Sequence, residues 1–290
     1  MDRSEALNYI IEQTLRGDLV FPTNVNASLQ IHQALDEPDC CMESAANLVV
    51  TEPLLAARLV AIANSVAYNR FGGGVTNVKT AISILGFSTL RAIVMSIAIR
   101  QLGHSIKNPQ LRRKASQLWE HSAHVAALAF FLAKKISHVD FEAALFIGIV
   151  HEVGGFYVLS RAEEFPVLLE NWPENSPEPD HSADSAHLAK IPEAIIGRAV
   201  LQKLMLPKTV ISSVETLWSG TRTISPETLG DTLMLANDLV TVISPFDVAS
   251  SELIEERRLS IDFKLGDSTL KKVLSTSEEE IHSLAKALMR

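Results

Sequence analysis

The chain of 290 residues has little cysteine, few aromatic residues and no excess of positive charge. Its two cysteines, Cys40 and Cys41, are adjacent, a spacing that rarely allows a mutual disulfide, so they indicate a reduced, cytoplasmic protein. Lysine and arginine number 26 against 34 acidic residues, and the resulting net charge of −8 would repel a nucleic-acid backbone. We therefore expect no nucleic-acid ligand.

Long uninterrupted hydrophobic runs are also missing. The N-terminus carries acidic residues and lacks the cationic start and long apolar region of a secretory signal. The run VAALAFFLA at 125–133 is among the longest, about half the length that a membrane span requires. We expect a cytoplasmic protein with no membrane insertion.

Apolar residues, 47% of the chain, recur at the spacing of a helix. They follow one another at three and four positions, as in Leu118, Val125, Ala129, Leu132 and Ile136, and no stretch alternates as a strand does. The glycines at 72–74 are not followed by GK[ST], which favours a turn between helices over a phosphate-binding loop. The sequence predicts an all-α protein with a sizeable core.

The polar segment HSIKNPQLRRK at 104–114 predicts a division of the chain into residues 1–112 and 113–290. The tail, 250–290, has the pattern of two amphipathic helices. These helices could pack back on the protein or present a face to a partner, and packing is the favoured interpretation.

A cluster of histidines and acids carries the candidate chemistry. His121 and His124 lie in the predicted helix LWEHSAHVAALA, and His151 and Glu152 come 30 residues after His121 in ALFIGIVHEVGG. Imidazole and carboxylate groups on neighbouring helices suit a divalent metal ion, with His124 as an alternative ligand one turn later. Equally, a lone imidazole on a half-buried face commonly only donates a hydrogen bond. The following glycines, 154–155, are expected to end or bend the helix.

Three segments resemble motifs of the HDOD family. They are FPTNV, TEPLLAARLVAIANS and AISILGFSTLRAIV, and the resemblance extends over about residues 20–240. It implies an all-α fold in which a helical N-terminal lobe, residues 1–112, packs on an HD-like helical lobe that includes the C-terminal helices, residues 113–290. The family is a degenerate relative of the HD metal-dependent phosphohydrolases and works in bacterial signalling.

The motif residues themselves predict structural roles. Glu52 and Pro53, where the family usually has Asp-Pro, have the pattern of a helix start, and Asn64 and Ser65 that of its end. Leu85 and Gly86 lie between apolar helical faces, where a missing side chain lets helices approach or bend.

The resemblance also implies which residues stand at the HD metal positions. His121 matches the first ligand and His151 the second, while Glu152 replaces the paired Asp. The last Asp aligns with Asn237; the adjacent Asp238 is turned by about 100° on a helix and is expected to point elsewhere.

We therefore expect a non-catalytic signal-transduction module that acts through contacts with a signalling protein, with a cleft between the lobes as the place for a ligand or partner segment. No cofactor is expected unless a divalent metal binds through His121, His151 and Glu152. The alternative is an enzyme, a metal-dependent phosphohydrolase or cyclic-nucleotide phosphodiesterase of the HD class. A third option is a sensor that binds a small molecule or nucleotide without turnover.

Overall fold

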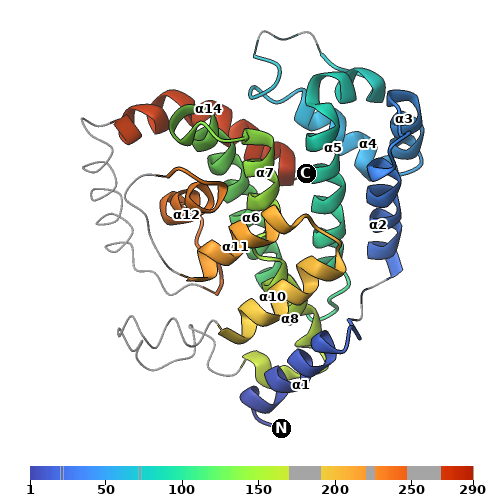
Figure 1. The fold of residues 1–290 in the computed structure, drawn as a ribbon, viewed down its shortest axis with the longest axis vertical. Coiled ribbons are helices and arrows are strands. Elements are labelled where there is room, and N and C mark those ends of the chain that lie inside the picture. Colours follow the sequence, from blue (N-terminus) through green and yellow to red (C-terminus); the bar gives the residue numbers. More distant parts are fainter. Residues whose placement is uncertain are drawn as a thin grey trace.

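The computed structural model describes residues 1–19, 21, 23–70, 72, 74–169, 191–219, 226–246 and 269–289. Every regular element in these ranges is a helix, which confirms the all-α prediction (Figure 1). The elements are α1 (Arg3–Leu15), α2 (Thr23–Asp36), α3 (Met42–Val50), α4 (Pro53–Ala63), α5 (Val78–His104), α6 (Pro109–Leu132), the π-helix η1 (Ala133–Ser137), α7 (Phe141–Val150), α8 (Val153–Arg161), the 3₁₀-helix η2 (Pro166–Leu169), α10 (Ile191–Lys203), α11 (Lys208–Ser219), α12 (Leu229–Leu239) and α14 (Thr269–Met289).

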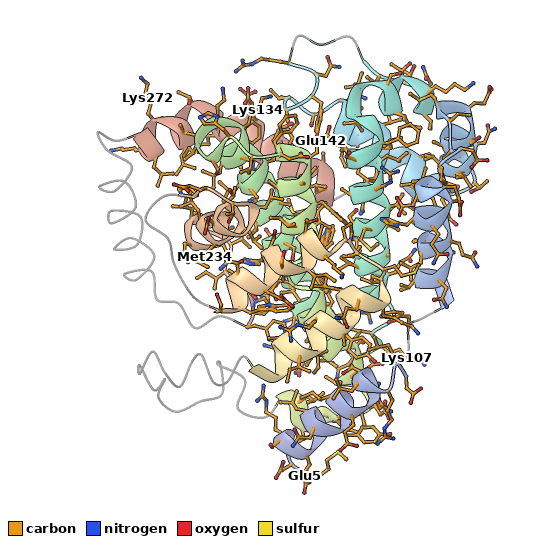
Figure 2. All side chains as sticks on the ribbon, in the orientation of Figure 1. Glu5, Lys107, Lys134, Glu142, Met234 and Lys272 are labelled. Carbon is orange, nitrogen blue, oxygen red and sulfur yellow. The ribbon has the colours of Figure 1, made fainter. Side chains whose placement is uncertain are left out.

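The helices form layers around α5, α6 and α7. Helices α2, α3 and α4 pack on α5, α14 packs on α6 and α4, and α12 packs on α6 and α7 (Figure 1). Buried apolar residues from α1 through to α14 join into a single core cluster. Side chains fill the space between the helices in Figure 2, whereas the exposed Glu5 and Lys272 project outward. This continuous core fixes the helices that carry the candidate site.

The first family motif shapes α4. Glu52 is the extended residue before the helix, Pro53 occupies its first turn, and Asn64 follows its last residue, so the predicted start and end are confirmed. The side-chain Nδ2 of Asn64 donates to the carbonyl oxygens of Val60 at 2.9 Å and Val75 at 2.7 Å. Val75 N–H donates back to Asn64 Oδ1 at 2.8 Å, so Asn64 holds the chain that follows the glycine-rich turn. Ser65 is buried and donates to Ile62.

The second motif bends α5. Gly86 has φ 76° and ψ 171°, a conformation inside α5 that is essentially restricted to glycine. The preceding Leu85 is 1% exposed. The predicted bend is confirmed, and the apolar helix α5 therefore runs in two directions along the core.

The C-terminal helix packs on the rest of the protein. Ser283 Oγ of α14 accepts a hydrogen bond from Val66 N–H at 3.1 Å, and Glu280 pairs with Arg70 at 2.7 Å. The favoured prediction of a packing role is thus confirmed for this helix. The other helix predicted in the tail lies outside the described residues.

The polar connection between the predicted lobes is short. Residues 105–108 separate α5 from α6, and Asn108 caps α6 by accepting from the backbone of Gln110 and Leu111. Helix α1 packs on α10 and η2, and Gln13 of α1 also accepts a hydrogen bond of 2.9 Å from Arg161 at the end of α8. The first helix therefore lies with elements from the second half of the sequence, and the division at residue 112 stays a prediction.

Two helical segments, Val78–His104 and Phe141–Arg161, are long and apolar enough to cross a membrane by length and composition alone, and α3 with α4 would add a third if that bent pair were one span. In the fold, 61% of the most apolar window of the first segment and 78% of that of the second are buried. Neither segment was predicted as a possible membrane span from the uninterrupted apolar runs of the sequence. Their apolar character is accounted for by their central position in the core.

Candidate metal centre

The two predicted histidine ligands lie face to face. His121 comes from the middle of α6, and His151 is the residue at which α7 ends. Their Nε2 atoms are 3.4 Å apart, and the side chains are 1% and 2% exposed. Gly148 allows this approach, because a side chain there would collide with the backbone of Ala126 on α6. Close packing of α6 on α7 therefore brings the imidazoles together.

Backbone carbonyls orient both rings. His121 Nδ1 lies 2.7 Å from the carbonyl oxygen of Val242, and His151 Nδ1 lies 2.8 Å from that of Gly148. A carbonyl only accepts, so we assign the ring proton to Nδ1 in both residues, which leaves an Nε2 lone pair on each neutral imidazole. Two lone pairs at this distance repel each other unless a proton or a metal ion lies between them. Histidine ligands of metal ions are held in this way.

Glu152 completes a group of three donors. It precedes α8, but its side chain does not cap that helix; Oε1 instead lies 4.0 Å from His121 Nε2. One ligand atom from each of His121, His151 and Glu152 lies within 4.8 Å of the others. The helix break falls at His151 and Glu152 themselves. The expectation that Gly154 and Gly155 end or bend the helix is therefore wrong in position, since the break comes before them and both glycines lie inside α8.

The remaining candidates are not part of this group. His124 is half-buried on α6, where burial is the main cause that lowers its pKa, with smaller contributions from His282 and His121 and an opposing one from Glu120. Asp238 is 6% exposed on α12, and Asn237 beside it is half-buried. Within the described part of the chain, the three-donor group includes neither His124 nor Asp238. Any ligand role for these residues stays a prediction.

Sequence reasoning missed the two carbonyl groups that orient the histidines. The Val242 carbonyl follows α12, so the chain beyond this helix contributes to the site through its backbone. No residue type marks a backbone acceptor, and no sequence signal could have found it. The Gly148 carbonyl lies three residues before His151, a local contact that a helix end makes available.

Two imidazoles and a carboxylate form a donor set that suits a divalent ion with three protein ligands. The protons assigned to Nδ1 also suit metal binding, because they leave the Nε2 atom of each ring without a hydrogen, as coordination requires. The residues present therefore fit one divalent ion. They supply one carboxylate where the catalytic HD pattern described above has two.

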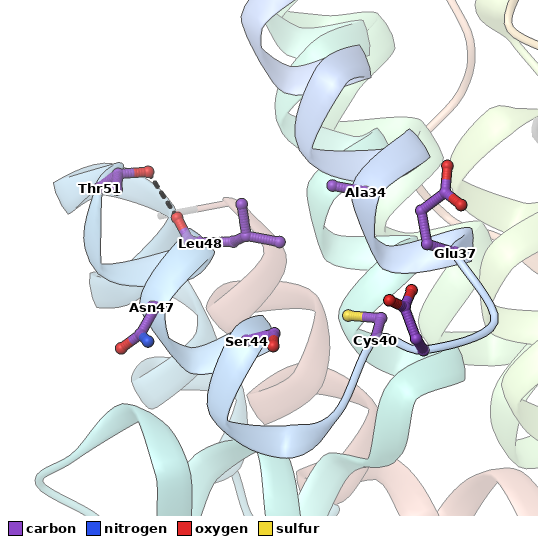
Figure 3. A pocket seen from close by; sticks show the side chains of 8 residues that line it. Ala34, Glu37, Cys40, Ser44, Asn47, Leu48 and Thr51 are labelled. Atoms are coloured by element: carbon purple, nitrogen blue, oxygen red, sulfur yellow. Dashed lines mark hydrogen bonds between the residues drawn. The ribbon is translucent and has the colours of Figure 1, made fainter.

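One hollow lies away from the histidines. It has a volume of about 440 Å³ and is lined by residues of α2, α3 and the connection between them (Figure 3). Cys40 and Ser44 are at its edge, and neighbouring Cys41 has its Sγ 3.3 Å from Ser44 Oγ. A ligand cleft at the histidines stays a prediction.

The all-helical fold resembles several solved structures over nearly the whole chain. A candidate metal-dependent phosphohydrolase from Shewanella amazonensis SB2B has a TM-score of 0.69 and 20% identity, with 99% of each chain covered. An HDOD domain protein of unknown function from Geobacter sulfurreducens has a TM-score of 0.64 and 19% identity, with 98% of each chain covered. A candidate signal transduction protein from Marinobacter aquaeolei VT8 has a TM-score of 0.62 and 20% identity, with 99% of this chain and 66% of that chain covered. These likenesses show a shared fold.

The fold and the paired histidines define an HD-like helical protein. The HDOD domain model matches residues 21–219, about two thirds of the sequence, so the chain belongs to the HDOD family. The resemblance found from the motifs is thereby confirmed. No curated protein matches the chain.

Proposed function

We propose that this protein is a non-catalytic bacterial signal-transduction module that acts through contacts with another signalling protein. The observation that supports this proposal most strongly is the closure of the three-donor group. His121 and His151 are 1% and 2% exposed, and Glu152 is 21% exposed along its side chain. Hydrolysis of a phosphoester requires the substrate and a water to reach the metal, and these side chains leave little surface for either.

The ligand count supports the same proposal. In the HD pattern, a second carboxylate on a later helix helps to hold the catalytic metal. The family resemblance puts Asn237 at that position, and Asp238 lies outside the three-donor group of the described residues. One carboxylate and two neutral imidazoles hold an ion with less charge compensation than the full set. The name of the Marinobacter relative, a candidate signal transduction protein, agrees with a signalling role.

The side chains of the site also have a structural role. His121 is tied to the backbone after α12, His151 is tied to α7, and Glu152 lies at the start of α8. The group thus joins four segments at one buried point. A divalent ion bound there would supply Lewis acidity to a coordinated water; the residues themselves orient the rings and exclude solvent. We propose the two lobes, 1–112 and 113–290, as the units whose relative position a partner would detect.

The second candidate function is a metal-dependent phosphohydrolase or cyclic-nucleotide phosphodiesterase of the HD class. It is favoured by one specific observation, the convergence of both Nε2 atoms and Glu152 with the Nδ1 atoms directed at carbonyls. The name of the Shewanella relative, a candidate metal-dependent phosphohydrolase, points to the same chemistry. A sensor that binds a nucleotide without turnover would use the same region.

Metal content separates these proposals. The protein is purified without a histidine tag, and its manganese, iron, nickel and zinc are measured by elemental mass spectrometry beside the His151→Ala variant. The non-catalytic proposal predicts no metal near one equivalent in either protein. Near-stoichiometric metal in the wild type that is lost in His151→Ala would favour the enzyme. His282→Ala, an exposed histidine on α14, is the matched control.

A further inference from the structure

One face of helix α3 forms a wall of the hollow between α2 and α3. The α3 residues on this wall have the i, i+3, i+4, i+7 spacing of a single helical face and are Ser44, Asn47, Leu48 and Thr51. The buried residues of the helix lie on its opposite face and are Ala45, Ala46 and Val49. Leu48 of α3 and Ala34 of α2 stand on opposite walls of the hollow (Figure 3). Helix α3 therefore packs on the protein with one face and leaves the other to the hollow.

The segment that builds this hollow carries negative charge without lysine or arginine. Between residues 17 and 57 the only charged side chains are the acidic residues Asp18, Asp36, Glu37, Asp39, Glu43 and Glu52. Cations of α5 compensate two of them, since Arg91 pairs with Asp36 and Lys79 with Glu43. Glu37 and Asp39 line the hollow, are exposed, and have no cationic partner among the described residues. The hollow therefore carries uncompensated negative charge.

Apolar side chains continue from the hollow onto the surface. Val50, the last residue of α3, is 62% exposed, and Leu54 in the first turn of α4 is 75% exposed. Val50 comes three positions after Asn47, so helical spacing places it on the flank of the face that lines the hollow. Leu54 follows Val50 across the short break between the two helices. Exposed apolar residues beside a hollow are typical of a surface that binds another protein.

We propose that the hollow between α2 and α3, with Val50 and Leu54 beside it, is the docking surface for a basic amphipathic helix of the signalling partner. This inference rests on the proposed function, because it names the surface through which that function would act. Helices α2 and α3 lie at an edge of the molecule, where a partner can approach them (Figure 1).

The chemistry of the surface selects this occupant. An amphipathic helix binds a groove through apolar side chains at helical spacing, and these would enter the hollow against Ala34 and Leu48. Lysine or arginine side chains at the edge of that helix would lie near Glu37 and Asp39. The same two carboxylates repel a nucleotide or another anion. The apolar surface beyond the hollow favours a protein segment over a small cation, which would leave it uncovered.

The test uses a fluorescent helical peptide made of leucine and lysine, with the leucines on one face. Its binding to the full chain is followed by fluorescence anisotropy at about 0.15 M salt, where attraction between distant charges is screened. Two matched peptides are measured beside it, one with glutamate in place of lysine and one with the same residues reordered so that no apolar face forms. We expect saturable binding of the basic amphipathic peptide and at least about tenfold weaker binding of the other two.

Two pairs of variants locate the binding. The double variant Glu37→Lys with Asp39→Lys should lose at least about tenfold in affinity, whereas Glu278→Lys with Glu279→Lys, on exposed residues of α14, changes the net charge equally and should stay within about twofold of wild type. Leu54→Ser should weaken binding at least about threefold. Its control is Leu15→Ser on α1, where the leucine is 74% exposed and binding should not change. Thermal unfolding checks that each variant is folded.

Three results would overturn the proposal: no saturable binding of the basic amphipathic peptide, equal binding of the reordered peptide, or an equal loss in the α14 variant. The last would show attraction to net charge alone. Self-association of the chain that disappears in Leu54→Ser, measured by analytical ultracentrifugation, would also overturn it, because the occupant would be a second copy. Metal content and turnover test the proposed function separately, so a failure of this surface is distinguishable from a failure of that function.

Discussion

The Nε2 atoms of His121 and His151 face each other at 3.4 Å while the Nδ1 atom of each ring is held by a backbone carbonyl. In the function that we propose, this pair corresponds to the histidine half of an HD site, and Glu152 adds a single carboxylate. Because the two histidines are buried, their contribution to the free energy of unfolding can be measured separately from any catalytic activity.

Removal of His151 should destabilise the protein. His151→Ala deletes a fully buried ring and leaves the Gly148 carbonyl without the ring N–H, so we expect the free energy of unfolding to fall by about 2–3 kcal/mol. Urea denaturation measures the change, with exposed His282→Ala expected to stay within about 0.5 kcal/mol of wild type. Equal stability of His151→Ala and wild type would mean that the buried pair does not stabilise the fold.

Gly86 should not tolerate a side chain. Its φ of 76° and ψ of 171° are costly for any residue with a Cβ, so Gly86→Ala should lower the free energy of unfolding by about 1–3 kcal/mol. Gly74→Ala is the control, because it has neither a positive φ nor an atom within 4 Å of an added Cβ. A Gly86→Ala variant as stable as Gly74→Ala would show that the bend in α5 relaxes without cost.

Asn64 should protect the amide of Val75. In Asn64→Ala, this N–H loses its acceptor, and its hydrogen exchange should accelerate. Asn77→Ala is the matched control, since the side chain of Asn77 accepts from the backbone N–H of Thr80 at the start of α5. NMR-detected exchange at Val75 measures the effect. Unchanged exchange in Asn64→Ala would contradict the structural role assigned to the Asn-Ser motif.

Cys41 should be the more reactive cysteine. Hydrogen bonds from the Ser44 side chain, and then from backbone N–H groups of Ser44 and Glu43, lower the pKa of Cys41, whereas burial is the main cause that raises the pKa of Cys40. The thiolate of Cys41 therefore forms at lower pH. The rate of iodoacetamide alkylation in Cys40→Ser, which keeps Cys41, should reach its midpoint at lower pH than in Cys41→Ser.

The effect on Cys41 should depend on Ser44. Ser44→Ala is expected to move the alkylation midpoint of Cys41 to higher pH, while Thr51→Val, on the same hollow but bonded to Leu48, should leave it unchanged. The same midpoint in both cysteine variants, or no response to Ser44→Ala, would contradict this assignment.

Much of the fold was predictable because its signals are local. The three-and-four spacing of apolar residues identifies helices. Pro53 and Gly86 mark a start and a bend through their own conformational limits, and Asn64 marks an end through its side-chain hydrogen bonds. The position of α1 on α10 and η2 was not predictable. It depends on contacts such as that between Gln13 and Arg161, far apart in the sequence.

The candidate site was only partly predictable. His121, His151 and Glu152 were identified because residue type and spacing carry their chemistry, and the structure brings them together. The direction of the Glu152 side chain depends on a helix break at that residue. The sequence had led us to expect the break at the glycines that follow it. The carbonyl of Val242 reaches His121 only through the packing of distant segments, whereas the carbonyl of Gly148 is local to His151 and becomes available where α7 ends.

We propose that this HDOD protein does not hydrolyse phosphoesters, and an assay of turnover is the test of that proposal. Wild type and His151→Ala are supplied in turn with manganese, iron, nickel and zinc, and phosphate or nucleotide release is followed with a generic phosphoester and with cyclic nucleotides. We expect the same background rate in both proteins with every metal. Metal-dependent turnover by the wild type that disappears in a folded His151→Ala protein would contradict it.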